Sequence, residues 1–383
     1  MTLKDLLEGC GLSQRDLARA LELSPAAVSD IVNHDRWPKT ADTRQLQAAI
    51  RKALRAAGAN ESRVKHLFRP SRARVKAEPQ PKETIMLLRR QGLFPKTKKH
   101  FGLMADPFDE IRGAEDVFLS SEIRYVRESM LHIAKHGGFL AVIGESGSGK
   151  STLRRDMVDR IIRDKLPVHV IEPYVLAMED NDTEGKSLKA LHIAEAIMAT
   201  VAPGESIKSS PEARFRQLHR VLRDSGRTGH AHVLVIEEAH GLPLKTLKHL
   251  KRFLELEDGF RKLLSVILLG QPELKHKLSE ANHEVREVVQ RCEVVELKPM
   301  NGSLAGYVAH RFERVGAEAG KVITEDGIEA LRSKLTGPAS RGGANDSVSL
   351  VYPLAVGNMI TAAMNLAADV GAPVVDPGII AQV

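Results

Sequence analysis

A chain of 383 residues has room for two or three domains of about 150 residues each. Its 43% hydrophobic and 27% charged residues are ordinary for a globular protein that buries a large core. No run of about eighteen apolar residues predicts a membrane span, and the first residues lack the apolar segment of a signal peptide. The two cysteines, Cys10 and Cys292, form no metal or redox spacing. These features argue against a membrane-spanning or disulfide-stabilised secreted protein. They predict a cytoplasmic protein with no membrane partner.

The beginning of the chain has the pattern of short amphipathic helices. Ser24 and Pro25 start one of them, with Ser as the N-cap and Pro at the first helical position. Residues 13–38 resemble the helix-turn-helix of the Cro/repressor type, in which the second helix enters the major groove of DNA. The resemblance implies DNA contacts from Ser29 and Asn33.

The predicted recognition helix lacks the basic residues that are usual in a helix that binds DNA. From Ser24 to Asn33 it carries no Lys or Arg, which are the common contacts to phosphate and guanine. A small helical bundle that binds protein therefore stays open as an alternative. We favour a DNA-binding domain of modest affinity.

Residues 62–100 are strongly basic. Twelve Lys and Arg face two Glu, a net charge of +10 in a chain whose total is +7. Four prolines prevent one continuous helix. Cations at this density attract a polyanion by releasing its condensed counterions. We expect a linker that also contacts the DNA backbone through Arg72, Arg74 and Lys76, and a solvated linker without that role is the alternative.

From Phe101 onward, predicted strands alternate with predicted helices, which favours a parallel sheet covered on both faces. The predicted strands are residues 139–143, 168–172, 232–240, 263–270 and 294–297. Helical patterns follow at residues 304–316, 325–335 and 354–369. Helices placed after the fifth strand suggest a lid.

The segment from Gly144 to Ser151 fits the pattern G-x-x-x-x-G-K-[ST] between a predicted strand and a predicted helix. Glycines let the backbone curl so that successive N–H groups face phosphate oxygens, with a helix N-terminus behind them. Lys150 would reach the β- and γ-phosphates, and the Ser151 hydroxyl would hold Mg²⁺. The predicted nucleotide-binding residues here are Gly144, Glu145, Ser146, Gly147, Ser148, Gly149, Lys150, Ser151 and Thr152. This stretch predicts a site for ATP and Mg²⁺.

Residues 233–240 read VLVIEEAH, four apolar residues followed by two acids, and resemble a Walker B strand. Glu237 stands where Asp is usual, so the resemblance implies that it joins the Mg²⁺ shell and binds the cofactor. Glu238 would orient the attacking water. The alternative is a pair of surface acids that cap a strand.

Two further stretches resemble AAA+ ATPases. Residues 268–274 look like the end of the strand that carries the sensor-1 residue, which puts Gln271 in the position that holds water against the γ-phosphate. Arg291 stands just before the fifth strand, where an arginine reaches the neighbouring subunit's nucleotide, and Arg286 competes for that role. A surface ion pair is the alternative for either arginine. No clear sensor-2 residue is present, and Arg341 lies in a segment that departs from the usual pattern.

Together these motifs resemble the DNA-transposition AAA+ ATPases, the group of the phage Mu B transposition protein, TniB and TnsC. The resemblance implies a homo-oligomer, a helical filament or a ring, that binds double-stranded DNA with little sequence preference. It also implies a transposase partner whose strand transfer the protein stimulates. Lys186 and Lys189 follow the second strand, where related ATPases present loops to DNA. The ATPase part is also similar to secretion ATPases of the ExeA type.

The predicted fold class is α/β, a P-loop AAA+ parallel sheet with a helical lid, preceded by a small all-α helix-turn-helix domain. The predicted domains are a helix-turn-helix at 1–60, a basic linker at 61–100, an ATPase core at 101–300 and a lid at 301–383. Alternatives to a transposition ATPase are an ExeA-like secretion ATPase, an ATP-switched transcription regulator, and a repair or replication loader.

Overall fold

The chain divides into two units, residues 1–81 and residues 82–383, and each is described by itself. The computed structural model describes residues 3, 6–7, 10–21, 23–34, 37, 43–59, 64, 67, 89–173, 190–279, 285–338 and 347–383. Among these residues no helix combines the length and the apolar character that a bilayer crossing requires.

The first unit is a small helical bundle. Its main helices are α2 (Gln14–Leu21), α3 (Pro25–His34) and α4 (Thr43–Ala56). Leu17, Val28, Ile50 and Leu54 are fully buried and form its centre. The Ser24 hydroxyl accepts a hydrogen bond from the Ala27 N–H at 3.2 Å, as expected for the N-cap of α3. The expected all-α domain is confirmed.

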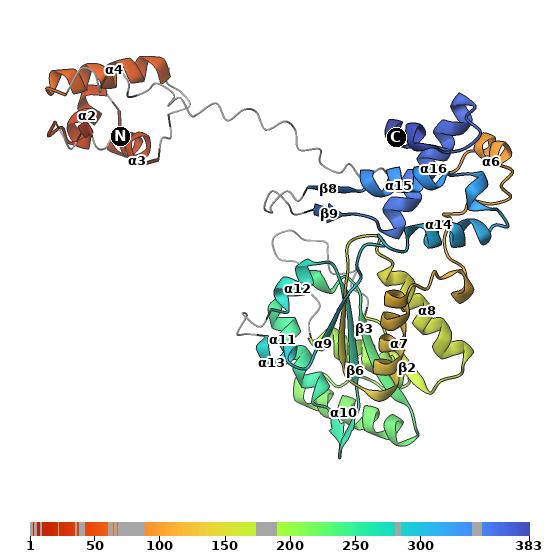
Figure 1. Ribbon diagram of the computed structural model, residues 1–383. Helices are drawn as coiled ribbons and strands as arrows, with labels where there is room; N and C mark the ends of the chain where they lie inside the picture. Colours follow the sequence, from red (N-terminus) through yellow and green to blue (C-terminus); the bar gives the residue numbers. More distant parts are fainter. Residues whose placement is uncertain are drawn as a thin grey trace. The chain divides into compact units, whose positions relative to one another are not determined.

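The second unit is built on a five-stranded parallel sheet in the order β2-β3-β6-β1-β7 (Figure 1). The strands are β1 (Phe139–Ile143), β2 (Val168–Ile171), β3 (Ala231–Ile236), β6 (Ser265–Gly270) and β7 (Glu293–Glu296). Every residue of β1 and β6 is buried, because these central strands are covered on both faces. A short antiparallel hairpin, β4 (Glu257–Asp258) and β5 (Arg261–Lys262), precedes β6. The predicted fold class is confirmed.

Helices cover the two faces of this sheet as separate layers (Figure 1). One face packs against α7 (Ser121–His136) and α8 (Lys150–Arg163). The other face packs against α9 (Ala190–Val201), α10 (Pro211–Arg227), α11 (Leu244–Leu254), α12 (Glu273–Lys277) and α13 (Arg286–Val289). Along β1 the side chains alternate between the two layers, because successive residues of a strand point to opposite faces.

The lid follows the fifth strand and has its own apolar core. Its elements are α14 (Leu304–Glu313), α15 (Glu325–Lys334), β8 (Thr336–Pro338), β9 (Ser347–Ser349), α16 (Pro353–Val370) and α17 (Pro377–Gln382). Three of these helices were predicted, whereas the β8–β9 hairpin and α17 were not. The described residues of this unit also contain three short 3₁₀ helices, Ala114–Asp116, Ala239–Gly241 and Ala319–Lys321.

The end of the basic stretch is also part of the second unit. Helix α6 (Pro95–Phe101) packs on α16, and its Thr97 hydroxyl donates to Asn365 Oδ1 at 2.8 Å. Lys96 forms an ion pair with Asp369 at 2.8 Å. Residues 95–100, which were expected in a linker, are thus folded against the lid. The reason is that one side of α6 packs on α16 and forms hydrogen bonds with it.

Candidate nucleotide site

The loop between β1 and α8 has the backbone shape that its glycines permit. Gly147 (φ 75°) and Gly149 (φ 99°) adopt the left-handed conformation that other residues avoid. A Cβ on Gly147 would also lie 2.4 Å from Cβ of Leu354, so only glycine fits beneath the start of α16. The Leu354 N–H donates to the Gly147 carbonyl at 3.3 Å, and the lid thus contacts the loop directly.

Lys150 is the buried cation of this loop, with 8% of its surface exposed. Its Nζ donates to the carbonyl oxygens of Gly144, at 2.7 Å, and Glu145, at 2.8 Å. Burial lowers the pKa of Lys150, while the nearby charges of Glu238, Glu145 and Glu237 act in the opposite direction. The carbonyls hold the ammonium in the curl of the loop, where a phosphate oxygen would be a stronger, charged partner.

A cavity of about 360 Å³ opens between the loop, the ends of two other strands and the lid. The parallel register pairs Ile143 with Gly270 and Ile236 with Leu268, so the carboxyl ends of β1, β3 and β6 meet at one edge. The cavity is lined by Phe108, Asp109, Glu110, Ile111, Ser146, Gly147, Gly149, Lys150, Ser151, Thr152, Arg155, Glu238, Gln271, Tyr307, Arg311, Pro353 and Leu354. The predicted phosphate loop, Glu238 and Gln271 therefore share one cavity.

The two acids at the end of β3 lie in different surroundings. Glu238 lines the cavity and has φ 48°, the left-handed region in which a non-glycine residue is strained. Glu237 is not among the residues that line the cavity, and it forms an ion pair with Arg154 at 3.3 Å. Arg154 also donates to Glu172 at 2.6 Å. The Mg²⁺ role of Glu237 stays a prediction.

The site fits a metal that arrives with the nucleotide. Among the described residues, no three His, Cys, Asp or Glu side chains lie close enough together to hold a metal ion. Mg²⁺ needs no such cluster, because it keeps several waters and binds through phosphates and one or two protein groups. Ser151 and Glu238 both line the cavity and fit that pattern.

A smaller apolar cavity of about 80 Å³ adjoins the first and shares Ile111, Gly149, Thr152, Tyr307 and Pro353 with it. Apolar residues that line only the smaller cavity include Val117, Phe118, Leu297 and Met300. A narrow apolar slot beside a phosphate cradle suits the flat base of a nucleotide. These residues could not be predicted from the sequence, because an apolar residue that lines such a cavity has the same pattern as an apolar residue in the core.

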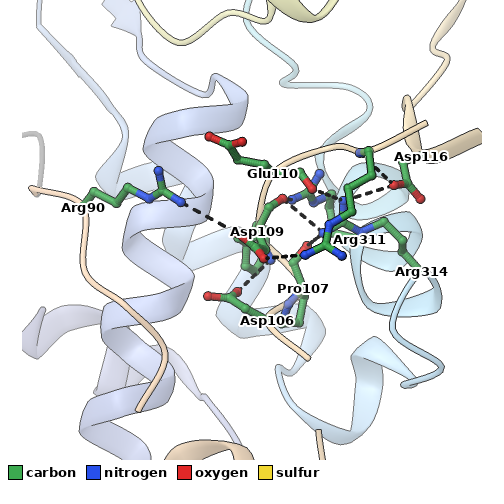
Figure 2. A network of polar contacts seen from close by, with 10 residues as sticks. Arg90, Asp106, Pro107, Asp109, Glu110, Asp116, Arg311 and Arg314 are labelled. Atoms are coloured by element: carbon green, nitrogen blue, oxygen red, sulfur yellow. Dashed lines mark hydrogen bonds and ion pairs between the residues drawn. The ribbon is translucent and has the colours of Figure 1, made fainter. Parts of the chain in front are cut away.

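Residues 106–118, here termed the strap, run from the cavity wall to α7 and are tied to α14 (Figure 2). Arg314 donates to the carbonyls of Asp109, at 3.1 Å, and Glu110, at 3.2 Å, and pairs with the Asp116 carboxylate at 3.5 Å. The backbone hydrogen bond from Glu110 lowers the pKa of the Asp109 side chain, and nearby arginines add to this. The strap is therefore a fixed wall of both cavities.

Other predicted residues lie outside these cavities. Arg286 and Arg291 are exposed, and Arg291 pairs with Glu255 at 3.6 Å. A role in a neighbouring subunit's site stays a prediction for both. Ser29 and Asn33 lie on α3, as expected, and their DNA contacts also stay predictions. Arg72, Arg74, Lys76, Lys186, Lys189 and Arg341 lie outside the described residues.

Comparisons with known proteins agree with this organisation. Residues 132–278 match the AAA domain family, and residues 3–50 match a helix-turn-helix family. The general secretion pathway protein A of Aeromonas hydrophila is 24% identical over 251 residues, which is 63% of this chain and 42% of that protein. The chain thus spans less than half of that relative's length.

Two of the solved structures that this chain resembles are an ORC2 protein and a RuvB protein. The ORC2 protein of Aeropyrum pernix, in its ADPNP–ADP complexes, is 15% identical with a TM-score of 0.45, covering 76% of this chain and 71% of that one. The RuvB Holliday junction branch migration motor of Thermotoga maritima is 16% identical with a TM-score of 0.39, covering 69% and 68%. From the family matches and the site, the chain carries an AAA-type P-loop ATPase domain, preceded by an N-terminal helix-turn-helix domain.

Proposed function

We propose that this protein is an ATP-dependent DNA-binding ATPase that assembles on double-stranded DNA with little sequence preference and delivers it to a transposase. The observation that carries the proposal is the union of an AAA-type ATPase domain, a helix-turn-helix domain and a stretch of net charge +10 in one chain. Contacts from such cations to phosphates position a protein on DNA but carry no sequence information. The proposed function places the protein in the cytoplasm.

Within the nucleotide site, each side chain has a proposed task. The loop amides and Lys150 hold the phosphate chain, and the strap and lid exclude water from it. Mg²⁺, when bound, neutralises phosphate charge, and the Ser151 hydroxyl would hold it. Glu238 orients the attacking water, and the Gln271 amide keeps that water against the terminal phosphate. ATP hydrolysis would then limit the lifetime of the DNA complex.

In this proposal, assembly brings an arginine of a neighbouring subunit to each nucleotide site. Arg286 and Arg291 are exposed and line neither cavity of their own chain. An arginine from a neighbouring subunit would stabilise the charge that develops on the transferred phosphoryl group. A helical filament or a ring of identical subunits would provide such a neighbour to each site.

A second candidate is a secretion-type ATPase, and the name of the Aeromonas hydrophila relative favours it. We place it second because the helix-turn-helix match and the basic stretch both point to a polyanion partner. An ATP-switched transcription regulator is the third candidate. It needs base contacts from α3, where the predicted readers are Ser29 and Asn33.

Electron microscopy of the full chain with ATP and plain duplex DNA tests the proposal, together with binding over a salt series on two unrelated duplexes. We expect DNA-bound oligomers on both duplexes, with similar affinities. Replacing Arg72, Arg74 and Lys76 by Gln should lower the slope of log affinity against log salt by about two to three units. Deleting residues 1–60 serves as the matched comparison and should change that slope little.

Each other result favours a named alternative. A preference of about a thousandfold for one duplex would indicate a sequence-specific regulator. A closed ring that forms without DNA, with no binding to either duplex, would indicate a secretion-type motor.

A further inference from the structure

Arg311, on α14, is a buried cation without an anionic partner. Only 4% of its surface is exposed, and its Nη2 donates to the Asp109 carbonyl at 2.6 Å. The guanidinium lies 5.6 Å from the centroid of the Phe108 ring, and its Nε has no hydrogen-bond partner. Within the described parts of the chain no carboxylate forms an ion pair with it. Burial lowers the pKa of Arg311, while the charges of Asp116 and Asp106, which form no ion pair with it, act in the opposite direction. Such a charge is costly to bury unless an anion joins it.

Arg314, the C-cap residue of α14, provides the contrast. It contacts the same strap but has a carboxylate partner, Asp116, and three carbonyl acceptors (Figure 2). It lines neither cavity. Arg314 alone therefore fastens the strap to this part of the lid. Holding the strap does not explain why Arg311 is buried as well.

The position of Arg311 beside the phosphate loop explains its burial. It lines the cavity of about 360 Å³ that also contains Lys150, Ser151 and Gln271. A guanidinium has five N–H donors in a planar fork that suits phosphate oxygens, and the Asp109 carbonyl occupies one of its nitrogens. Nη1 forms no hydrogen bond within the described residues and, unlike Nε, is not fully buried, so its donors are available to an anion in that cavity.

We propose that Arg311 is a phosphate ligand of the bound nucleotide, and that its guanidinium joins the phosphate to the strap through the Asp109 carbonyl. The inference rests on the proposed nucleotide site. Ile111, Val117 and Phe118 belong to the same strap and line the apolar cavity. Phosphate binding at one end of the strap therefore steadies the base pocket at its other end.

The test uses the full chain and compares Arg311→Met with Arg314→Met, with binding of ATP and ADP measured calorimetrically in Mg²⁺. We expect Arg311→Met to weaken ATP binding by about 10- to 100-fold, as for a lost hydrogen bond to a charged group. Arg314→Met should weaken it less than Arg311→Met does, because it removes a fastening of the strap but no donor that lines the cavity. Arg311→Lys, which keeps the charge but loses the fork, should lie between the wild type and Arg311→Met.

Hydrogen exchange of the strap is the second readout. ATP should slow exchange of strap amides in the wild type and in Arg314→Met but not in Arg311→Met. The nucleotide-free Arg311→Met protein should be no less heat-stable than the wild type, because an unpaired buried charge is replaced by an apolar side chain of similar volume. Equal loss of ATP affinity in the two Met variants, or none in Arg311→Met, would overturn the proposal. A wild type that binds no ATP would instead refute the nucleotide site itself.

Discussion

Neighbouring glutamates at the end of β3 differ in what they contact. Glu238 lines the phosphate cavity with Gln271, and its Oε2 lies 3.4 Å from His240 Nδ1. Glu237 pairs instead with Arg154. A strained backbone at Glu238 is consistent with a residue held in place for chemistry rather than for stability. The geometry thus favours Glu238 as the group that orients water.

We expect Glu238→Gln to bind ATP but to hydrolyse it at least about 100-fold more slowly, as when a general base is lost. Single-turnover hydrolysis and nucleotide affinity, measured in parallel, check this. Glu237→Gln is the matched control and should retain more activity. Equal turnover in wild type and Glu238→Gln would move the role to Glu237 or to a partner-supplied group.

His232 makes the fold sensitive to acid. Burial lowers its pKa from 6.5 to about 4, and nearby His169 and His230 contribute in the same direction. The neutral ring is also held by its neighbours, with Nδ1 2.9 Å from the Leu263 carbonyl and Nε2 2.9 Å from Ser225 Oγ. Below pH 6.5 the unfolded chain therefore binds a proton that the folded chain does not, so stability falls as the pH falls.

This histidine should remove about 2 kcal/mol of stability between pH 7.5 and pH 5. Urea unfolding at the two pH values measures the loss, and His232→Gln should reduce it. His276→Gln, an exposed histidine on α12, is the control and should leave the pH dependence unchanged. An identical pH dependence in His232→Gln would contradict a depressed pKa at this position.

At the scale of elements, α7 and α8 are joined by a buried ion pair. Arg127 donates two hydrogen bonds to Asp156, at 2.6 Å and 2.8 Å, and the Asp156 side chain is 0% exposed. The Asp156 hydrogen bonds raise the pKa of Arg127, more than burial lowers it. The pair fixes α8, the helix that begins at the phosphate loop, against α7, its neighbour in the same layer.

Replacing Arg127 by Met should destabilise the protein by about 3–5 kcal/mol, because it leaves the Asp156 carboxylate buried and unpaired. Thermal or urea unfolding measures this. Arg163→Met is the matched control, since its pair with Asp159 on the same helix is exposed, and it should cost less than about 1 kcal/mol. Similar losses of stability in both variants would mean that burial of the Arg127–Asp156 pair does not determine its contribution to stability.

At the scale of the whole molecule, the ATPase unit includes more than its sheet. Helix α6 and the strap precede the sheet in sequence and pack against lid helices that follow it. The contacts run through Asn365 on α16 and through Arg314, the C-cap residue of α14. The first described helix of the ATPase unit in chain order, α6, therefore packs on the lid. A nucleotide bound in the cavity between loop and lid would also contact the strap, the segment that follows the basic stretch.

The proposed oligomer has a test in mixed subunits. Lys150→Ala should not bind nucleotide, and Arg291→Ala should bind it but hydrolyse it slowly. Mixing the two should restore part of the ATPase activity, because one subunit supplies an intact cavity and the other an intact arginine. Steady-state hydrolysis against mixing ratio measures this, with Arg286→Ala as the competing variant. No recovery at any ratio, with assembly intact, would count against Arg291 as a residue acting in a neighbour.

Local patterns allowed much of the fold to be predicted. The strands at Phe139–Ile143 and Ser265–Gly270, and the helices at Glu325–Lys334 and Pro353–Val370, follow from apolar periodicity, which neighbouring residues specify. The phosphate loop could be predicted for the same reason, since its glycines and Lys150 act within one turn of chain. Short pairings such as β8–β9, and helix α6 in a basic stretch, have no comparable local signal.

A phosphate loop between a buried strand and a helix can be predicted from local sequence, because that motif is complete within a few residues. The groups around the loop depend on how distant segments pack. Which acid of β3 lines the cavity depends on strand register and on a pairing with Arg154. The place of Arg311 depends on α14 folding back over a strap about two hundred residues earlier in the chain. Contacts between segments so far apart arise from packing, and no local pattern of residues encodes them.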